Sequence, residues 1–320
     1  MHSITDHIKH IVTFVRVAES RGFTAAARRL GVSTAAVSKS VSLLENQLGV
    51  KLLNRTTRSL SLTDDGKLFF FRCRNILADL ESAEAAVTRT VAAPRGKLRI
   101  HAPVALGRRV VMPVLLDLTQ RYPELSIDAD FSDRAPDLAE EALDATVLIG
   151  EPADSRLVAK PLARIRYVTC ATPRYLAKHG APQSPDELAG HSCLTYVQWQ
   201  TGRYHAWEFL KDGRHFTITP SGMLNVNHAE AILDAVTAGA GIARMASFVA
   251  APAIADGRLQ LVLKDWIAPG PRVHVMYLHT RHVSPRTRAF VKEMTQALPA
   301  YLPWEREIGL PPPENLPSEG

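Results

Sequence analysis

Apolar positions near the start of the chain recur at helical spacing and predict three helices within the first 50 residues. Four of them form the stripe of a helix over about residues 4–20: Ile8, Ile11, Val15 and Ala18. Thr24 is placed to cap a second, short helix that ends at Gly31, and Ser33 is placed to cap a third that ends at Gly49. The third helix has its own apolar face, made of Val37, Val41, Leu44 and Leu48.

The short connection between the second and third helices, residues 31–33, predicts a helix-turn-helix. The polar face of the third helix carries small or hydrogen-bonding side chains and a single charge: Thr34, Ala35, Ser38, Lys39 and Ser42. Small residues permit close approach to a major groove, where serine, threonine and lysine donate to phosphates or base edges. An ordinary amphipathic helix is the alternative, but such a helix more often points Glu and Lys outward.

Residues 51–62 predict a hairpin directly after the third helix. Apolar and small polar residues alternate at its end, as in a short strand: Ser59, Leu60, Ser61 and Leu62. Leu52 and Leu53 begin the partner strand, and Arg55 and Arg58 lie near the tip. A basic wing of this kind places arginine against phosphate or in a narrow minor groove.

A long helix is expected next, capped by Thr63 and with Asp64 and Asp65 in its first turn, where the helix dipole favours acids. Its apolar residues follow a heptad spacing: Phe69, Cys73, Ile76, Leu80, Ala83 and Val87. This seam predicts dimerisation with the same helix of a second subunit, and packing on the chain's own body is the alternative. The helix is expected to end near Val91, before a hinge at 92–96.

From Lys97 onward, strand and helix patterns alternate, which predicts parallel α/β sheets. The strands are expected at 98–103, 125–131, 145–149, 167–171, 224–227, 241–245, 259–263 and 273–278. The helices are expected at 107–121, 173–178, 228–238 and 284–298. The last stretch, 301–320, contains five prolines and no periodic pattern, so it is expected to be a disordered tail.

The distribution of charge separates the N-terminus from the rest of the chain. The 320 residues are 46% apolar and 22% charged, which is ordinary globular composition and allows two or three domains. Residues 1–62 contain nine basic and three acidic residues, so they carry the whole formal charge of +6 and leave the remainder neutral. This asymmetry favours a polyanion partner for the N-terminus, with a merely soluble basic surface as the alternative.

Several classes of protein are disfavoured. Cys73, Cys170 and Cys193 lie far apart, without zinc or disulfide spacing, which fits a reducing cytoplasm; neither a metal nor a cofactor is expected. No signal peptide and no run of about 18 apolar residues are found, so we expect a cytoplasmic protein without a membrane span. No nucleophile elbow, P-loop or dinucleotide glycine pattern is found and the 12 histidines are scattered, so we expect no catalytic residues and no enzyme.

Residues 23–67, FTAAARRLGVSTAAVSKSVSLLENQLGVKLLNRTTRSLSLTDDGK, resemble the DNA-binding signature of the LysR-type transcriptional regulators over nearly their whole length. The resemblance implies that Ser33, Ser38 with Lys39, and Arg55 face DNA, and that the long helix dimerises in antiparallel fashion. The family more often has arginine at the position of Lys39, and lysine is a point donor, not a bidentate fork. Pattern and resemblance together give these candidate DNA contacts: Thr24, Ser33, Thr34, Ala35, Ser38, Lys39, Ser42, Arg55 and Arg58.

The resemblance also implies a multidomain fold. An all-α-rich winged helix-turn-helix is expected at 1–62 and a linker and dimerisation helix at 63–93. The regulatory domain at 94–300 is expected to be a two-lobed α/β body like a periplasmic binding protein. Its first lobe would comprise 95–162 and 267–300 and its second lobe 163–266, with crossovers near Leu162 and Trp266.

Ligands in such bodies lie in the cleft at the carboxyl ends of strands. The candidate effector-binding residues are therefore Pro103, Val104, Ala105, Gly150, Glu151, Tyr196, Asn227, His228 and Arg244. The family often places a hydroxyl in the first of these turns, whereas this chain has none there. Arg244 is an alternative anion partner or a member of a salt bridge within its lobe. His228 is expected to cap its own helix, with ligand contact as the alternative, and the aromatic segment at 196–207 is expected to be core.

These features predict a sequence-specific DNA-binding transcription regulator of the LysR type, controlled by a small effector between the lobes. The expected partners are double-stranded operator DNA, the effector, and further copies of the chain in a homodimer or homotetramer, with RNA polymerase as a candidate. A ligand-independent DNA-binding regulator is one alternative. A solute-binding protein fused to a DNA-binding module is another, but solute binding outside the cell needs an export leader.

Overall fold

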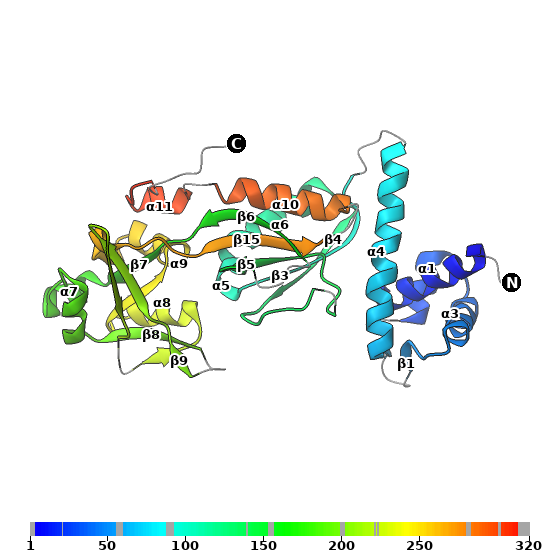
Figure 1. Cartoon of the computed structure of the whole chain (residues 1–320), viewed down its shortest axis with the longest axis horizontal. Helices are drawn as coiled ribbons and strands as arrows, with labels where there is room; N and C mark the ends of the chain where they lie inside the picture. Colours follow the sequence, from blue (N-terminus) through cyan, green and yellow to red (C-terminus); the bar gives the residue numbers. More distant parts are fainter. Residues whose placement is uncertain are drawn as a thin grey trace.

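The computed structural model describes residues 4–20, 22–55, 60–87, 93–138, 140–152, 157–198, 202–220, 222, 224–279, 283–299 and 302–312. The molecule is elongated (Figure 1): a small helical domain lies at the N-terminal end, one long helix stands beside it, and two sheet-containing lobes follow in a row. No helix among these described residues is long and apolar enough to cross a bilayer.

The N-terminal domain contains three helices and a two-stranded hairpin. Its elements are α1 (Ile4–Ser20), α2 (Phe23–Leu30), α3 (Thr34–Leu48), β1 (Leu53–Arg55) and β2 (Leu60–Leu62). Gly31 and Gly49 end α2 and α3 in the left-handed conformation, with φ of 69° and 73°. The Ser33 side chain accepts a hydrogen bond from the Ala36 amide at 3.2 Å, which confirms it as the cap of α3.

The long helix α4 (Asp64–Val87) packs on two sides. Its start is capped as expected, because the Thr63 hydroxyl accepts from the Gly66 amide at 2.9 Å. On one side, the Phe69 and Phe70 rings lie 5.7 and 6.4 Å from that of Phe14 in α1. On the other side, the Arg99 guanidinium of the body lies over Phe70. Figure 1 shows α4 standing between the helical domain and the body.

The first lobe is built on a five-stranded sheet of order β4-β3-β5-β15-β6. Its strands are β3 (Gly96–Ala102), β4 (Leu125–Phe131), β5 (Ala145–Ile149), β6 (Leu157–Arg164) and β15 (Arg272–Leu278). The helical segments of this lobe are α5 (Val104–Leu106), the π-helical turn η1 (Gly107–Val111), α6 (Met112–Arg121) and α10 (Pro285–Ala297). One buried apolar cluster links this sheet and its helices to the second lobe.

The second lobe contains the sheet β12-β8-β13-β7-β14, with β9 beside β8, and a separate hairpin β10-β11. Its strands are β7 (Tyr167–Ala171), β8 (Cys193–Gln198), β9 (Arg203–Tyr204), β10 (Trp207–Lys211), β11 (Arg214–Ile218), β12 (Asn225–Val226), β13 (Ile242–Ala246) and β14 (Gln260–Val262). Its helices are α7 (Pro173–His179), η2 (Pro185–Gly190), α8 (Ala229–Thr237), α9 (Ser247–Ala255) and η3 (Lys264–Trp266). The chain passes between the lobes after β6 and again after β14 (Figure 1).

Two expectations about the body need correction. The sheets are mixed and not wholly parallel, because β15 pairs antiparallel with both β5 and β6 and β7 pairs antiparallel with β13 and β14. The expected helix over 107–121 is divided into η1 and α6. Pro113 follows the wide turn and has no N–H to continue the regular ladder of hydrogen bonds, which accounts for the break.

The expectation of a disordered tail over 301–320 is wrong for residues 302–312. They include a short helix, α11 (Pro303–Glu307), with Leu302, Ile308 and Leu310 buried in the body's core. Composition misled the prediction because the apolar residues contact the core far away in sequence, without any local periodicity. Residues 313–320 lie outside the described part of the chain.

Candidate nucleic-acid interface and interlobe residues

The outer face of α3 has the features that a groove-reading helix needs. Ser33, Thr34, Ala35 and Lys39 are exposed, and Ser38 and Ser42 are half-buried on the same helix. The opposite face anchors the helix, with Val37, Val41 and Leu44 at 1% exposure or less. The helix is therefore held rigidly while its small polar face and one ammonium group remain open to solvent.

Thr24 does not cap α2, which corrects the expectation. The helix begins one residue earlier, at Phe23, and its N-cap residue is Gly22. Thr24 is exposed on the first turn of α2, so it stays a candidate contact only by its position.

The wing is present as a short antiparallel hairpin. Its register pairs Leu53 with Leu62, Asn54 with Ser61 and Arg55 with Leu60. Arg55 therefore ends β1 at the tip side of the hairpin. Its side chain, and the tip residues 56–59 with Arg58, lie outside the described residues.

A buried carboxylate that sequence reasoning missed joins α3 to the wing. Glu45 is 2% exposed, and its carboxylate accepts from the amides of Leu52 and Leu53 at 3.0 and 3.1 Å and from Lys51 Nζ at 3.0 Å. Burial raises the pKa of Glu45, but the hydrogen bonds from Lys51 and the two amides outweigh it and hold the pKa below its ordinary value. The carboxylate thus fixes the start of the wing to the end of the recognition helix.

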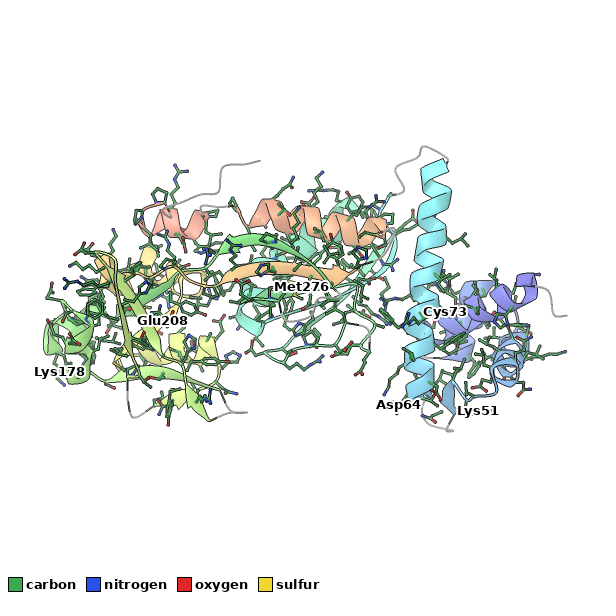
Figure 2. The ribbon with its side chains drawn as sticks, in the orientation of Figure 1. Lys51, Asp64, Cys73, Lys178, Glu208 and Met276 are labelled. Atoms are coloured by element: carbon green, nitrogen blue, oxygen red, sulfur yellow. The ribbon has the colours of Figure 1, made fainter. Side chains whose placement is uncertain are left out.

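The wing is also fixed to α4. Thr63 donates its hydroxyl to the Lys51 carbonyl at 2.6 Å, and Figure 2 places Lys51 and Asp64 together at this end of the domain. Gly66 lies so close to the wing that a Cβ there would stand 1.9 Å from the Leu52 carbonyl oxygen. Only glycine fits at this joint, so the wing and the first turn of α4 are packed directly against each other.

The apolar seam predicted along α4 divides into two parts. Cys73 is 3% exposed and Phe69 is partly buried, and both belong to the core of the N-terminal domain, where burial raises the pKa of the Cys73 thiol to about 11. Ile76 and Leu80 are 65% and 51% exposed. The side chains of the last two seam residues, Ala83 and Val87, lie outside the described residues. Intramolecular packing thus uses the first two seam positions, and the dimerisation seam stays a prediction for the others.

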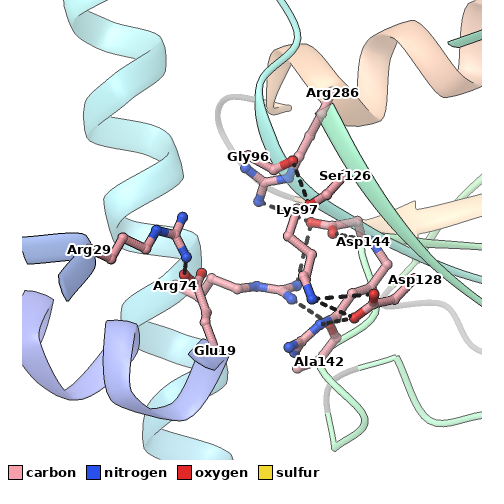
Figure 3. Close-up of polar contacts among 11 residues, drawn as sticks. Glu19, Arg29, Arg74, Gly96, Lys97, Ser126, Asp128, Ala142, Asp144 and Arg286 are labelled. Atoms are coloured by element: carbon pink, nitrogen blue, oxygen red, sulfur yellow. Dashed lines mark hydrogen bonds and ion pairs between the residues drawn. The ribbon is translucent and has the colours of Figure 1, made fainter. Parts of the chain in front are cut away.

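Buried charges join α4 to the body (Figure 3). Arg74 is 6% exposed and donates to the Ala142 carbonyl, and its Nη2 lies 3.4 Å from Asp144. The Asp144 carboxylate also accepts from Arg286 Nη2 at 3.1 Å and from the Arg99 amide at 2.8 Å. One carboxylate therefore links the long helix, the first strand of the body and α10.

A bidentate ion pair bridges the two lobes. Arg109 in η1 donates from Nε and Nη2 to the two carboxylate oxygens of Glu230 in α8, at 2.8 and 2.7 Å. The hydrogen bond from Arg109 and its charge outweigh burial and lower the pKa of Glu230, so the pair is charged at neutral pH. The pair ties the segment after β3 to the first turn of α8.

The candidate effector residues occupy strand ends in both lobes. In the first turn, the Val104 amide already donates to the Asp133 carboxylate at 3.0 Å, and Pro103 and Ala105 flank it. Burial raises the pKa of Tyr196, and the charge of Asp133 raises it further. The second effect shows that β8 of the second lobe lies within electrostatic range of that turn. Among the other strand-end positions, Gly150 is half-buried like Val104 and Tyr196, whereas Glu151 and Asn227 are exposed.

Arg244 forms no salt bridge with the described residues of its lobe, and its role as an anion partner for a ligand stays a prediction. No carboxylate among the described residues pairs with it; its Nη2 donates to the Glu208 carbonyl at 2.8 Å. Its guanidinium lies over the rings of Tyr167 and Phe209, at 4.9 and 5.6 Å from their centroids. Burial lowers the pKa of Arg244 to about 10. It is a cation held between aromatic faces, and the salt-bridge alternative is wrong.

His228 and part of the aromatic segment differ from what the sequence predicts. His228 is the N-cap residue of α8, but its side chain makes no capping hydrogen bond, so the capping expectation is wrong. The expectation that the aromatic segment is core is confirmed for Trp207, which is 1% exposed, and is wrong for Tyr204, which is 49% exposed. Trp199 lies outside the described residues.

Comparison with known proteins agrees with this geometry. The family model "Bacterial regulatory helix-turn-helix protein, lysR family" matches residues 8–67, and the model "LysR substrate binding domain" matches residues 92–299. An HTH-type transcriptional repressor from Pseudomonas aeruginosa is 36% identical over 286 residues, which cover 89% of this chain and 90% of the relative.

Solved structures show the same architecture. The LysR-type regulator CrgA from Neisseria meningitidis matches with a TM-score of 0.59 and 32% identity, covering 91% of this chain and 98% of that one. The full-length virulence activator AphB from Vibrio cholerae matches with a TM-score of 0.57 and 26% identity, covering 90% and 98%. With a winged helix-turn-helix, a linker helix and a two-lobed regulatory body, the chain belongs to the LysR family of transcriptional regulators.

Proposed function

We propose that α3 enters a major groove of operator DNA, with Lys39, the exposed hydroxyls of Ser33 and Thr34, and the half-buried Ser38 as its contacts. The observation that carries this proposal is the rigid mounting of a helix whose open face is small and polar. Arg55, at the end of β1, is proposed to contact a phosphate beside the groove. In this proposal the protein binds DNA and catalyses no reaction. It acts in the cytoplasm, where the DNA lies.

A two-fold assembly follows from the same proposal. A single α3 covers one half-site, and sequence selection over a longer operator needs a second copy. We propose that α4 supplies the contact, because Ile76 and Leu80 expose large apolar side chains one turn apart on this helix. A homodimer or a homotetramer built from such dimers would place two recognition helices on one face of the duplex, where RNA polymerase is a further candidate partner.

The two-lobed body is proposed to bind a small effector at the facing strand ends. Support comes from polar groups of both lobes: the Asp133 carboxylate of the first lobe, which accepts from the Val104 amide, and the Tyr196 hydroxyl of the second, which lies within electrostatic range of Asp133. The Arg109–Glu230 pair beside them ties the lobes in one arrangement. A ligand that prefers a different arrangement would shift the population of the body and, through α4, the DNA contacts.

One titration tests both parts of this proposal. Genomic fragments that the full chain retains are sequenced, and the affinity for the enriched sequence is compared with that for a shuffled duplex of equal composition. We expect the enriched sequence to bind at least about 1,000-fold more tightly at the same salt concentration. Equal affinities would contradict sequence-specific binding.

The titration is then repeated with small acids, aromatic compounds and amino acids. A compound that changes operator affinity about 5-fold or more supports effector control. If no compound in a broad set changes the affinity while specific binding persists, the ligand-independent regulator is the better description.

A further inference from the structure

A concave site lies where the N-terminal domain, α4 and the body meet. It is a cavity of about 390 Å³, far from the interlobe strand ends, and residues of all three parts line it. The N-terminal domain contributes Val15, Arg16, Glu19 and Arg29, α4 contributes Arg74 and Leu77, and the body contributes Arg95, Gly96, Lys97, Glu124 and Arg286. Figure 3 shows Arg29 with Glu19 on one side and Lys97 with Arg286 on the other.

The lining of the cavity has far more positive than negative charge. Six cationic side chains line it, against two carboxylates, Glu19 and Glu124.

The carboxylates near the cavity are already shared between cations. Glu19 accepts from Arg16 and Arg29, at 2.9 and 3.0 Å, and Asp144 behind the wall pairs with both Arg74 and Arg286. Asp128 pairs with Lys97, so even with these outer carboxylates the cations exceed the anions by two.

Two buried guanidinium groups in the wall are not fully hydrogen-bonded. Within the described part of the chain, Nε of Arg74 and Nε of Arg286 are buried and have no acceptor. Burial lowers the pKa of Arg74; Asp144 offsets this, and the like charges of Arg286 and Arg99 lower it again. A buried donor without an acceptor and a repelling neighbour are both costly, and an anion bound in the cavity would offset the repulsion between these guanidinium groups.

We propose that this cavity binds a small anion with at least two negative charges, of the chemical class of phosphate esters or pyrophosphates. Guanidinium groups form two parallel hydrogen bonds with phosphate oxygens, and most cations in the wall are arginines. The volume exceeds that of one phosphate and falls in the range of small-molecule sites. The proposal does not rest on the effector site between the lobes.

Such an anion would hold the DNA-binding domain against the body. Arg29 belongs to α2, next to the recognition helix, whereas Lys97 and Arg286 belong to the first lobe. A ligand that contacts both sides binds only when they face one another. Its binding free energy therefore stabilises that arrangement of the two domains.

Inorganic pyrophosphate is the probe for the full chain, with sodium chloride at matched ionic strength as the reference. We expect saturable binding by calorimetry and a higher melting temperature than in the reference salt. Arg29→Gln with Lys97→Gln removes one cation from each side, and we expect the dissociation constant to rise roughly tenfold or more. Glu124→Gln removes a carboxylate from the wall, and we expect tighter binding.

The DNA-binding face is the main competing phosphate site, and Lys39→Ala separates the two. We expect this variant to bind pyrophosphate like the wild type, since Lys39 is on α3 and does not line the cavity. Each variant's melting temperature without pyrophosphate shows whether it is folded. No saturable binding by the wild type, or a loss caused by Lys39→Ala and not by the double variant, would overturn the proposal.

Discussion

Replacing Asp144 by alanine is expected to lower the free energy of unfolding by about 3–5 kcal/mol, because removal of one partner leaves buried charges uncompensated. The Asp144 side chain is 6% exposed and faces two guanidinium groups, those of Arg74 and Arg286. Its other oxygen accepts from the Arg99 amide, which would also lose its partner. Urea denaturation of the full chain measures the change as a lower midpoint.

The matched control is Asp128→Ala. Asp128 also pairs with cations of β3, Lys97 at 3.0 Å and Arg99 at 3.7 Å, but its side chain is 52% exposed. Solvent screens an exposed pair, so the expected loss is below about 1 kcal/mol. Equal losses for the two variants would show that Asp144 does not hold the junction between α4 and the body.

Glu305→Ala is expected to have an effect of similar size, about 3–5 kcal/mol, where α11 packs on the second lobe. Glu305 is 2% exposed and accepts from Arg166 Nε at 2.9 Å and from the Ser247 hydroxyl at 2.7 Å. Arg166 also donates from Nη1 to the Pro311 carbonyl at 2.7 Å, so the pair fixes α11 and the segment after it to the second lobe. The alanine variant leaves that guanidinium without its carboxylate.

Thermal unfolding followed by circular dichroism checks this expectation, with a lower melting temperature by roughly 10 °C. Glu307→Ala is the control, because Glu307 lies in the same short helix and is exposed. A melting temperature unchanged by Glu305→Ala would mean that the Glu305 ion pair and hydrogen bonds do not stabilise the attachment of α11 to the second lobe.

The parts of the fold that are encoded locally could be predicted from the sequence. Ser33, Gly31 and Gly49 mark the ends of α2 and α3 through hydrogen bonds and backbone conformations that involve only neighbouring residues. Thr63 does the same for α4. These signals sufficed to place the recognition helix and the wing.

One missed element carried a local signal. The β10-β11 hairpin turns at Asp212-Gly213, with φ of 51° and 74°, and an Asp-Gly pair between alternating apolar residues is a strong hairpin signal. Only Trp207 of this hairpin was expected to be core, and no strand was predicted at 208–218. The hairpin was therefore predictable in principle.

Other features depend on contacts distant in sequence and could not be read from local patterns. Glu45 looks like a polar residue on an ordinary helix, and only the fold shows that two wing amides converge on it. Arg74 and Asp144 lie 70 residues apart and meet only when α4 packs on the body. The heptad spacing of α4 was real, but the spacing alone could not show that Phe69 and Cys73 pack within the chain.

The central claim is that DNA contact is confined to the basic N-terminal domain, with Lys39 and Arg55 as key contacts. Gel-shift titration of the full chain on its enriched operator, at several salt concentrations, tests this most directly. We expect Lys39→Ala and Arg55→Ala each to weaken binding roughly 10- to 100-fold, and Arg55→Ala also to lower the salt slope by about one. Lys178→Ala on the far lobe (Figure 2) should leave both affinity and slope unchanged. Unchanged operator affinity in the Lys39 and Arg55 variants, or an equal loss in the Lys178 variant, would contradict the account.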